Sequence, residues 1–201
     1  PGSCCMSAED GGCLNKGKCM LHGKRINLRL IRNENECQTL LEAFNDLSQR
    51  GSGDHTELKH PQSRLKKFAE NGLWGEEQGT LLITDKQDTM LGTIGFQKML
   101  DFELELGYRL LKKEDRGKGY MGESLRLFSA YLFATKPIHR LRLQIVADNV
   151  ASRKLAEKCG YQKEGVLRNA YFYRGRLCDF VIYGMIREEC QDLAELVARP
   201  I

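Results

Sequence analysis

The sequence has few of the features that mark membrane, secreted or fibrous proteins. It contains four prolines and one tryptophan in 201 residues, and no apolar run long enough to cross a bilayer. Its first residues lack the uninterrupted apolar stretch of a signal peptide. These absences predict a cytoplasmic protein with reduced thiols and no membrane partner.

Charge of one sign is also scarce. The net charge is +4 at pH 7, from 31 basic and 27 acidic residues. Such a mild excess suits an anionic cofactor and is too small to indicate a nucleic-acid-binding protein. The apolar content of 41% and the length allow one domain with a core of its own.

Eight cysteines fall into two groups, four in the first twenty residues and four scattered through the rest. The first group lacks the repeated Cys-x-x-Cys spacing of a structural zinc site. We therefore predict no metal site and interpret residues 1–24 as a flexible, Cys-rich leader, with zinc binding as the alternative. We interpret the scattered cysteines as small core or surface residues.

The apolar pattern predicts one mixed domain over residues 25–190 and a C-terminal tail over 191–201. Alternation predicts strands over 26–30, 79–84, 90–99, 102–111, 141–147, 166–173 and 177–186. Helical spacing predicts helices over 36–47, 62–71, 122–134 and 149–159. This order indicates an α/β (α+β) fold with a largely antiparallel sheet.

The most informative segment is Arg116-Gly117-Lys118-Gly119-Tyr120-Met121-Gly122, between a predicted strand and a predicted helix. Glycines let backbone amides approach a ligand, and a helix start directs free N–H groups and a positive dipole end to the same place. Two basic side chains add full charges. The segment predicts a cradle for a diphosphate, with a plain structural turn as the alternative.

Residues 117–122 also satisfy Gly-x-Gly-x-x-Gly, the fingerprint of dinucleotide-binding folds. That fingerprint requires the first glycine directly after a strand, within repeated βαβ units. Here residues 112–116 separate the strand from the glycine, and only one such unit is predicted. The spacing disfavours a Rossmann fold.

Three blocks of sequence resemble the GNAT N-acetyltransferases over about residues 26–187. They are Gly107-Tyr108-Arg109-Leu110 with the glycine segment and Glu123, Asn149 to Tyr161, and Glu164-Gly165 with Gly175-x-x-x-Asp179. The third block resembles the RimJ/RimL-like branch. The resemblance implies the GNAT fold, a mixed and mostly antiparallel sheet with helices on both faces. It also implies direct transfer from acetyl-CoA to a primary amine, either a protein N-terminal α-amine or a small-molecule amine.

The resemblance also implies where acetyl-CoA binds. Backbone amides of Leu110 and Leu111 would hold the thioester at a splayed strand end, with a bulge at Gly107. Asn149 and Ser152 would contact pantetheine, although Asn149 also suits a helix N-cap. The diphosphate would contact Arg116, Gly117, Lys118, Gly119, Tyr120, Met121 and Gly122. Met121 departs from the family pattern, which has a small residue there.

Two residues are predicted to be catalytic. Glu105 matches the position of a proton acceptor in many family members, and it shares a strand face with Glu103; a solvated face of paired charges is the alternative. Ala156 occupies the position of the family's helix tyrosine. We therefore predict that Ser152 serves the departing thiolate as acid or hydrogen-bond donor.

The acceptor amine is predicted to lie against Tyr171 and Tyr173, which share one face of the last hairpin; core packing is the alternative. Trp74 with Glu76 and Glu77 forms a weaker candidate for the same role. Two other functions stay open: a GNAT enzyme that uses another acyl-CoA or an aminoacyl-tRNA, and a CoA-binding sensor without catalysis. The sequence leaves the acceptor and a homodimer undecided.

Overall fold

One mixed sheet organises the part of the chain that this computed structural model describes, residues 20–51, 58, 60–173 and 175–198. Its eight strands lie in the order β1-β2-β3-β4-β5-β6-β8-β7. The strands are β1 (Met20–His22), β2 (Asn27–Arg29), β3 (Gln78–Thr84), β4 (Met90–Leu100), β5 (Glu103–Leu110), β6 (Arg140–Val146), β7 (Gln162–Tyr173) and β8 (Arg176–Ile186). The helices are α1 (Glu34–Asn45), α2 (Pro61–Asn71), α3 (Tyr120–Thr135), α4 (Val150–Lys158) and α5 (Leu193–Leu196), with 3-10 turns η1 (Leu47–Gln49), η2 (Lys113–Asp115) and η3 (Arg187–Glu189).

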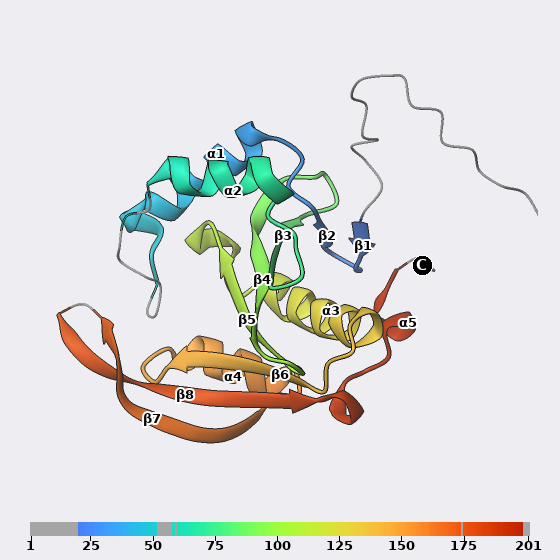
Figure 1. The fold of residues 1–201 in the computed structure, drawn as a ribbon, viewed down its shortest axis with the longest axis vertical. Helices are drawn as coiled ribbons and strands as arrows, with labels where there is room; N and C mark the ends of the chain where they lie inside the picture. Colours follow the sequence, from blue (N-terminus) through green and yellow to red (C-terminus); the bar gives the residue numbers. More distant parts are fainter. Residues whose placement is uncertain (1–19, 52–57, 59, 174, 199–201) are drawn as a thin grey trace, which may run out of the picture.

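All neighbouring strands are antiparallel except β5 and β6, which run parallel. The parallel pair is short, because only Glu103–Glu105 of β5 face Arg140–Arg142 of β6. Beyond those residues the two strands diverge (Figure 1). The predicted α/β fold with a mostly antiparallel sheet is confirmed, and the sheet is split at its centre.

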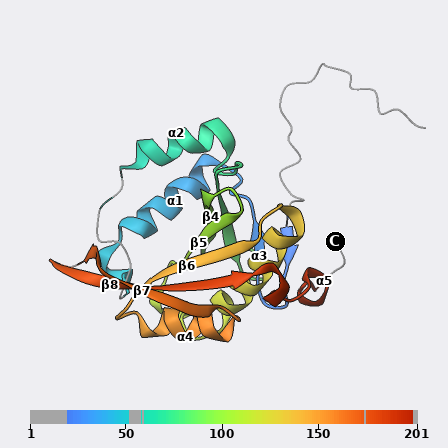
Figure 2. The ribbon, with the colours of Figure 1, turned by 60° about the horizontal axis from the view of Figure 1, so that its bottom comes forward.

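Helices cover both faces of the sheet, as predicted. Successive side chains on a strand point to opposite faces. On β3, Leu82 packs in the cluster that holds α1 and α2, whereas Leu81 and Ile83 pack in the cluster that holds α3 and α4. Figure 2 shows α1 and α2 together on one side, with α3 and α4 away from them.

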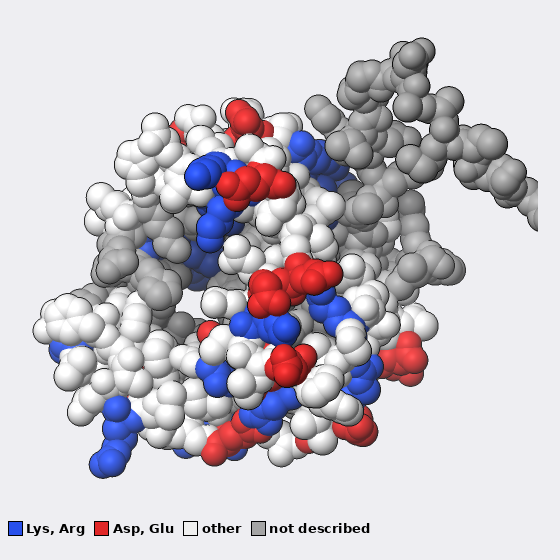
Figure 3. Space-filling model, in the orientation of Figure 1, with Lys and Arg blue, Asp and Glu red and all other residues white. Residues whose placement is uncertain are grey.

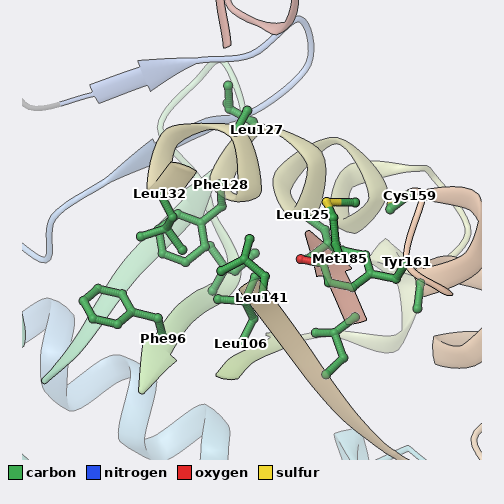
Figure 4. Close-up of a cluster of buried hydrophobic side chains, with 14 of the residues drawn as sticks. Phe96, Leu106, Leu125, Leu127, Phe128, Leu132, Leu141, Cys159, Tyr161 and Met185 are labelled. Carbon is green, nitrogen blue, oxygen red and sulfur yellow. The ribbon is translucent and has the colours of Figure 1, made fainter. Parts of the chain in front are cut away.

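The larger core forms around α3, which is apolar on most of its circumference. Leu125, Phe128 and Leu132 have no exposed surface and point towards strand residues such as Phe96 and Leu106 (Figure 4). Burial of a leucine or phenylalanine side chain contributes about 1.5–3 kcal/mol relative to leaving it in water. The segment that follows the glycine loop is therefore anchored by the main core.

Element boundaries differ from the predictions where tertiary contacts decide them. The predicted leader contains β1, which is a strand because it pairs with β2, and residues 1–19 of the leader lie outside the described residues. The predicted tail contains α5, where Leu193 packs into the core. Helix α3 begins at Tyr120 rather than at residue 122, since Gly119 already has the cap position.

The scattered cysteines are core or partly buried residues, as predicted. Cys37, Cys159 and Cys178 are buried, Cys190 is half-buried, and all four are free thiols. Among the described helices, none combines the length and the apolar character needed to span a bilayer.

Candidate functional site

A cleft of about 1280 Å³ opens where β5 and β6 diverge. Figure 3 shows the molecule hollowed between the side that carries α1 and α2 and the side that carries β7 and β8. Eleven of the predicted site residues line this cleft: Glu105, Leu110, Arg116, Gly117, Gly119, Tyr120, Met121, Gly122, Asn149, Ser152 and Tyr171. Leu111, Lys118 and Tyr173 do not line it. The structure therefore brings residues from four separate segments to one place.

Strand β5 divides the cleft into two sides. Leu104 and Leu106 belong to the core around α3, and Tyr108 and Leu110 pack against the same core. The alternate residues Glu105 and Arg109 point to the other face, where α1 and α2 lie. Ligands on the two sides of β5 thus meet different side chains.

The backbone of β5 offers an amide to the gap at Leu110. The Leu111 amide donates to the Leu91 carbonyl at 2.9 Å within the sheet, so it is already used. Because hydrogen-bonding groups alternate along an antiparallel strand, the Leu110 N–H points to the opposite edge, where β6 has diverged. Gly107 pairs regularly with Gly95, so the predicted bulge at Gly107 is wrong. The strand end is open because it loses its parallel partner.

The glycine loop leads directly into the first turn of α3. Gly117 and Gly119 have φ of +77° and +82°, a region that other residues adopt only with strain. The Glu123 amide closes the first helical turn on the Gly119 carbonyl at 3.1 Å. The amides of Tyr120, Met121 and Gly122 precede it, and the first amides of a helix have no partner within the helix. This arrangement fits a diphosphate.

Arg25 fastens this loop from outside. Its Nε donates to Glu123 Oε2 at 3.0 Å, and its Nη1 donates to the Lys118 carbonyl at 2.9 Å. A Cβ on Gly119 would lie 2.8 Å from the Arg25 guanidinium. Glycine is therefore favoured at residue 119 by its φ, and a larger residue would also displace the Arg25 guanidinium.

Met121 does not obstruct the cradle. Its side chain is buried in the core around α3, so its departure from the family pattern changes the packing beneath the loop. Gly122 lies where α3 meets α4: a Cβ there would be in van der Waals contact with Leu155 Cδ1 at 3.4 Å, and the Cys159 thiol donates to the Gly122 carbonyl at 3.5 Å.

The two predicted basic side chains of the loop have partners within the protein. Arg116 donates to the Gln49 carbonyl at 2.7 Å, and Lys118 pairs with Asp115 at 3.0 Å, which raises the pKa of Lys118. Further cations line the cleft from α3 and α4: Arg126, Lys154 and Lys158. The sequence analysis missed them. The spacing of four between the two lysines, which places them on one helix face, was the available signal.

Ser152 on α4 contacts both its own helix cap and the β5 side of the cleft. Asn149 caps α4 by accepting from the Ser152 amide at 3.2 Å, so the N-cap interpretation is confirmed. The Ser152 Oγ lies 2.7 Å from the Tyr108 hydroxyl. Burial raises the pKa of Tyr108 to about 12. Tyr108 is a candidate functional residue that the sequence analysis left unassigned, although its alternation with Leu104 and Leu106 placed it on this side.

Glu105 lies in an ion pair at the start of the split. Its Oε2 accepts from Arg142 Nη2 at 2.8 Å and from Nε at 3.1 Å. Glu103 lies 3.6 and 3.7 Å from Arg140 and Arg142. The alternative of paired charges thus describes both carboxylates, but Glu105 lines the cleft and Glu103 does not.

The predicted acceptor tyrosines are stacked on each other, with ring centroids 6.0 Å apart. Tyr171 lines the cleft, whereas Tyr173 is buried and donates to the Gly51 carbonyl at 3.0 Å. Tyr173 therefore ties the hairpin to the segment after α1. Trp74 is half-buried and packs against the core, edge-on to Phe96 at 5.5 Å, and it does not line the cleft, so the structure gives no support to its predicted contact with the amine.

Comparison with known proteins gives a consistent result. The family model described as "Acetyltransferase (GNAT) domain" matches residues 25–162. An uncharacterized N-acetyltransferase of Bacillus subtilis, YoaA, is 28% identical over 175 residues, which are 84% of this chain and 97% of that protein.

Solved structures of similar fold include two that contain CoA. A spermidine N-acetyltransferase from Vibrio cholerae in complex with CoA and spermine has a TM-score of 0.69 at 17% identity, covering 82% of this chain and 96% of that chain. RimL, a ribosomal L7/L12 α-N-protein acetyltransferase in complex with CoA, has a TM-score of 0.68 at 20% identity, covering 83% and 97%. At these identities the likeness concerns the fold.

Proposed function

The chain belongs to the GNAT family and is an acetyl-CoA-dependent N-acetyltransferase, and on this premise we propose how its cleft residues divide the reaction. The donor lies on the α3 and α4 side of β5, and the acceptor amine lies on the α1 and α2 side. The observation that carries the proposal is the split between β5 and β6, which leaves the Leu110 amide, Glu105 and the glycine loop around one cleft.

The donor site rests on the glycine loop. The first amides of α3, at Tyr120, Met121 and Gly122, and the positive end of the helix dipole bind the diphosphate. Arg126, Lys154 and Lys158 supply the charge around it. Asn149 lies at the start of α4, where its amide N–H₂ can donate while its oxygen caps the helix. Bound acetyl-CoA supplies the acetyl group as a thioester.

The Leu110 amide acts on the thioester oxygen. It points into the gap between β5 and β6, and backbone N–H donors that are fixed before reaction stabilise negative charge without reorganisation. The Leu111 amide, used by Leu91, stabilises the strand instead. One oriented donor of this kind contributes about 3 kcal/mol to catalysis in other acyl transferases.

Glu105 receives the proton that the amine loses. Both contacts from Arg142 fall on Oε2, so among the described residues no donor is bound to Oε1. That oxygen takes the proton directly or through one water. Arg142 is a positioning residue, because its two bonds to one oxygen fix the direction of the carboxylate.

Ser152 and Tyr108 stabilise the departing thiolate. With its pKa raised to about 12, the Tyr108 phenol keeps its proton at neutral pH. A thiol has a pKa of about 8.5, so full proton transfer from Tyr108 to the sulfur would be uphill. We therefore assign the pair as a hydrogen-bond relay, in which Tyr108 donates to Ser152 and Ser152 donates to the thiolate.

The acceptor is a primary amine held beside Tyr171, either a protein N-terminus or a small molecule. The names of the fold relatives include both classes, a spermidine acetyltransferase and a ribosomal-protein acetyltransferase. The proposal also places the enzyme in the cytoplasm. It leaves a homodimer and a tRNA donor as outcomes for experiment.

The test is thiol release from acetyl-CoA, followed over a panel of amines and short peptides. Turnover with at least one amine is the expected result. Thermal stabilisation by CoA without turnover would indicate the sensor instead, and the absence of CoA binding would overturn the proposal. Replacing acetyl-CoA by other acyl-CoAs and by charged tRNA in the same assay identifies the donor.

A further inference from the structure

Three arginines converge on the wall of the cleft that α1 and α2 form. Arg64 of α2 and Arg109 of β5 place their guanidinium carbons 5.3 and 5.0 Å from the centroid of the Phe44 ring. Arg50, which follows η1, donates to the Phe44 carbonyl. All four residues line the cleft, and the three cations share Phe44 as a neighbour. We call Arg50, Arg64 and Arg109 the arginine wall.

Arg50 is buried and Arg64 is half-buried, and within the described part of the chain neither forms an ion pair with a carboxylate. The neighbour that bonds the Arg64 side chain is the thiol of Cys37. Arg50 is 8% exposed. The Nε atoms of Arg50 and Arg64 are buried with no hydrogen-bond partner in the described part of the chain. Burial lowers the pKa of Arg64, which means that its surroundings disfavour the charge.

In the described lining, no carboxylate is bound to Arg50 or Arg64. Glu105 is bound by Arg142, and Asp115 is bound by Lys118. Arginine presents a planar fork of donors that fits a carboxylate or phosphate. A bound anion would therefore supply acceptors to Arg50 and Arg64 and balance a charge that is costly to bury.

The wall faces the acceptor side of β5. Arg109 leaves the strand on the face opposite to Tyr108, whose hydroxyl meets Ser152 on α4. Leu111, on the Arg109 face, packs against α1. The diphosphate cradle and its lysines lie on α3 and α4. The arginine wall and the donor site therefore lie on opposite faces of β5.

We propose that the acceptor is a primary amine that also carries a carboxylate or phosphate group, and that Arg50 and Arg64, beside Arg109, bind this anion while the amine reaches Glu105. Gly107 lies between Glu105 and Arg109 on the same face, and a Cβ there would meet no atom within 4 Å. The acceptor therefore has room to extend along β5 from the carboxylate to the arginines. A polyamine would meet like charge at this wall. The inference rests on the proposed function and specifies its substrate class.

The first test compares amines that differ only in the anion. Phosphoethanolamine is paired with ethanolamine, and β-alanine with β-alaninamide; a short peptide with aspartate at its second residue is paired with its asparagine counterpart. We expect a kcat/KM at least about tenfold higher for the anionic member of one pair or more. The pair that shows the preference distinguishes a small anionic amine from an acidic peptide.

The outcomes separate this inference from the proposed function. Equal or better turnover of neutral amines and spermidine would overturn the anionic acceptor and leave the acetyltransferase intact. If no amine releases CoA, the proposed function fails, and calorimetry of phosphoethanolamine and β-alanine with the CoA-bound protein still decides the inference. Binding of neither anionic amine would overturn it.

The second test removes the arginines. We expect Arg64→Gln to raise the KM for the preferred anionic amine about tenfold or more and to abolish its advantage over the neutral partner, with Arg64→Lys restoring part of it. Arg176→Gln, which removes an exposed charge outside the cleft, is the matched control for net charge. Arg50→Gln repeats the test at the buried residue, with a thermal melt to show that it folds. A raised KM for acetyl-CoA with the preference for the anion retained would assign the wall to the donor and overturn the inference.

Discussion

The hydroxyl of Tyr108 lies 2.7 Å from the Oγ of Ser152, which joins the open end of β5 to the first turn of α4. A second pair with the same separation, Ser129 and Tyr161, lies in the core outside the cleft. The two pairs have the same chemistry in different places. One of them is expected to serve catalysis and the other stability, which makes each a control for the other.

The Tyr108 and Ser152 hydroxyls are expected to act as one unit. Ser152→Ala and Tyr108→Phe should each lower kcat about tenfold or more with little change in the KM for acetyl-CoA, and the double variant should lose little more than the worse single variant. Steady-state kinetics of the cycle measure this coupling. Ser129→Ala and Tyr161→Phe should lower the melting temperature and leave kcat unchanged. Additive losses, or losses confined to KM, would contradict the relay.

Substitution of Glu105 is expected to lower kcat more than the same substitution of Glu103. Glu105→Gln removes the proton acceptor and is expected to lower kcat about a hundredfold, the lower range for general base catalysis. Glu103→Gln is the matched control, because it belongs to the same arginine cluster but does not line the cleft. Equal effects of the two variants would show that Glu105 is an ordinary member of the charge cluster.

Gly119 should be required for CoA binding. An alanine there would be strained at φ +82° and would displace the Arg25 guanidinium that bonds the loop, so Gly119→Ala is expected to weaken CoA binding at least about tenfold. Gly72 has φ +64° at the end of α2, and a Cβ there would meet no atom within 4 Å. Gly72→Ala should therefore cost about 1 kcal/mol of stability and leave CoA affinity unchanged. Calorimetric titration with CoA compares the two.

Gly107 should tolerate a side chain in the fold but not in the reaction. Valine suits a strand and would meet no atom at this position, so Gly107→Val should change the free energy of unfolding by less than about 0.5 kcal/mol. Its side chain would fill the acceptor side of β5, so turnover should be lost while CoA still binds. Gly165→Val on β7 is the control, with equal room and no place in the cleft. Retained turnover in Gly107→Val would place the acceptor elsewhere.

Ionisation of the Tyr108 phenol is expected to lower the free energy of unfolding at alkaline pH. The phenol ionises near pH 10 in the unfolded chain and near pH 12 in the folded protein, so between these values the folded state holds the extra proton. Its contribution is complete below pH 10 and is lost as the pH rises to 12, by about 1.4 kcal/mol for each pH unit. Denaturant unfolding of wild type and Tyr108→Phe at pH 9 to 11 measures the difference. A parallel decline in both proteins would contradict the prediction.

The sequence predicted correctly those elements whose conformation is determined by neighbouring residues in the chain. The glycines of residues 117–122, the alternation in β5 and the cap at Asn149 each determine structure within a few residues, and all three lie where predicted. Strand β1 could not be predicted, because three residues form a strand only by pairing with β2. Trp74 was misplaced for a similar reason: its partners, Phe96 and Phe128, are distant in sequence.

The cleft chemistry was predictable in part. Resemblance predicted catalytic roles for Glu105 and Ser152, and both line the cleft. Their partners, Arg142 and Tyr108, come from elements that meet only in the folded protein. The arginine wall gave no local signal at all. Arg50, Arg64 and Arg109 lie far apart in sequence, and each alone has the pattern of an ordinary surface residue.

The alternation along β5 has a consequence for how such an enzyme diversifies. In the proposed mechanism Tyr108 and Leu110 serve the donor from one face of the strand, and Glu105, Gly107 and Arg109 face the acceptor from the other. A substitution at one of the odd-numbered positions alters the acceptor wall without touching the groups that hold the thioester. On this mechanism new acceptor amines would be acquired by single mutations, while recognition of the shared acetyl donor would be inherited intact.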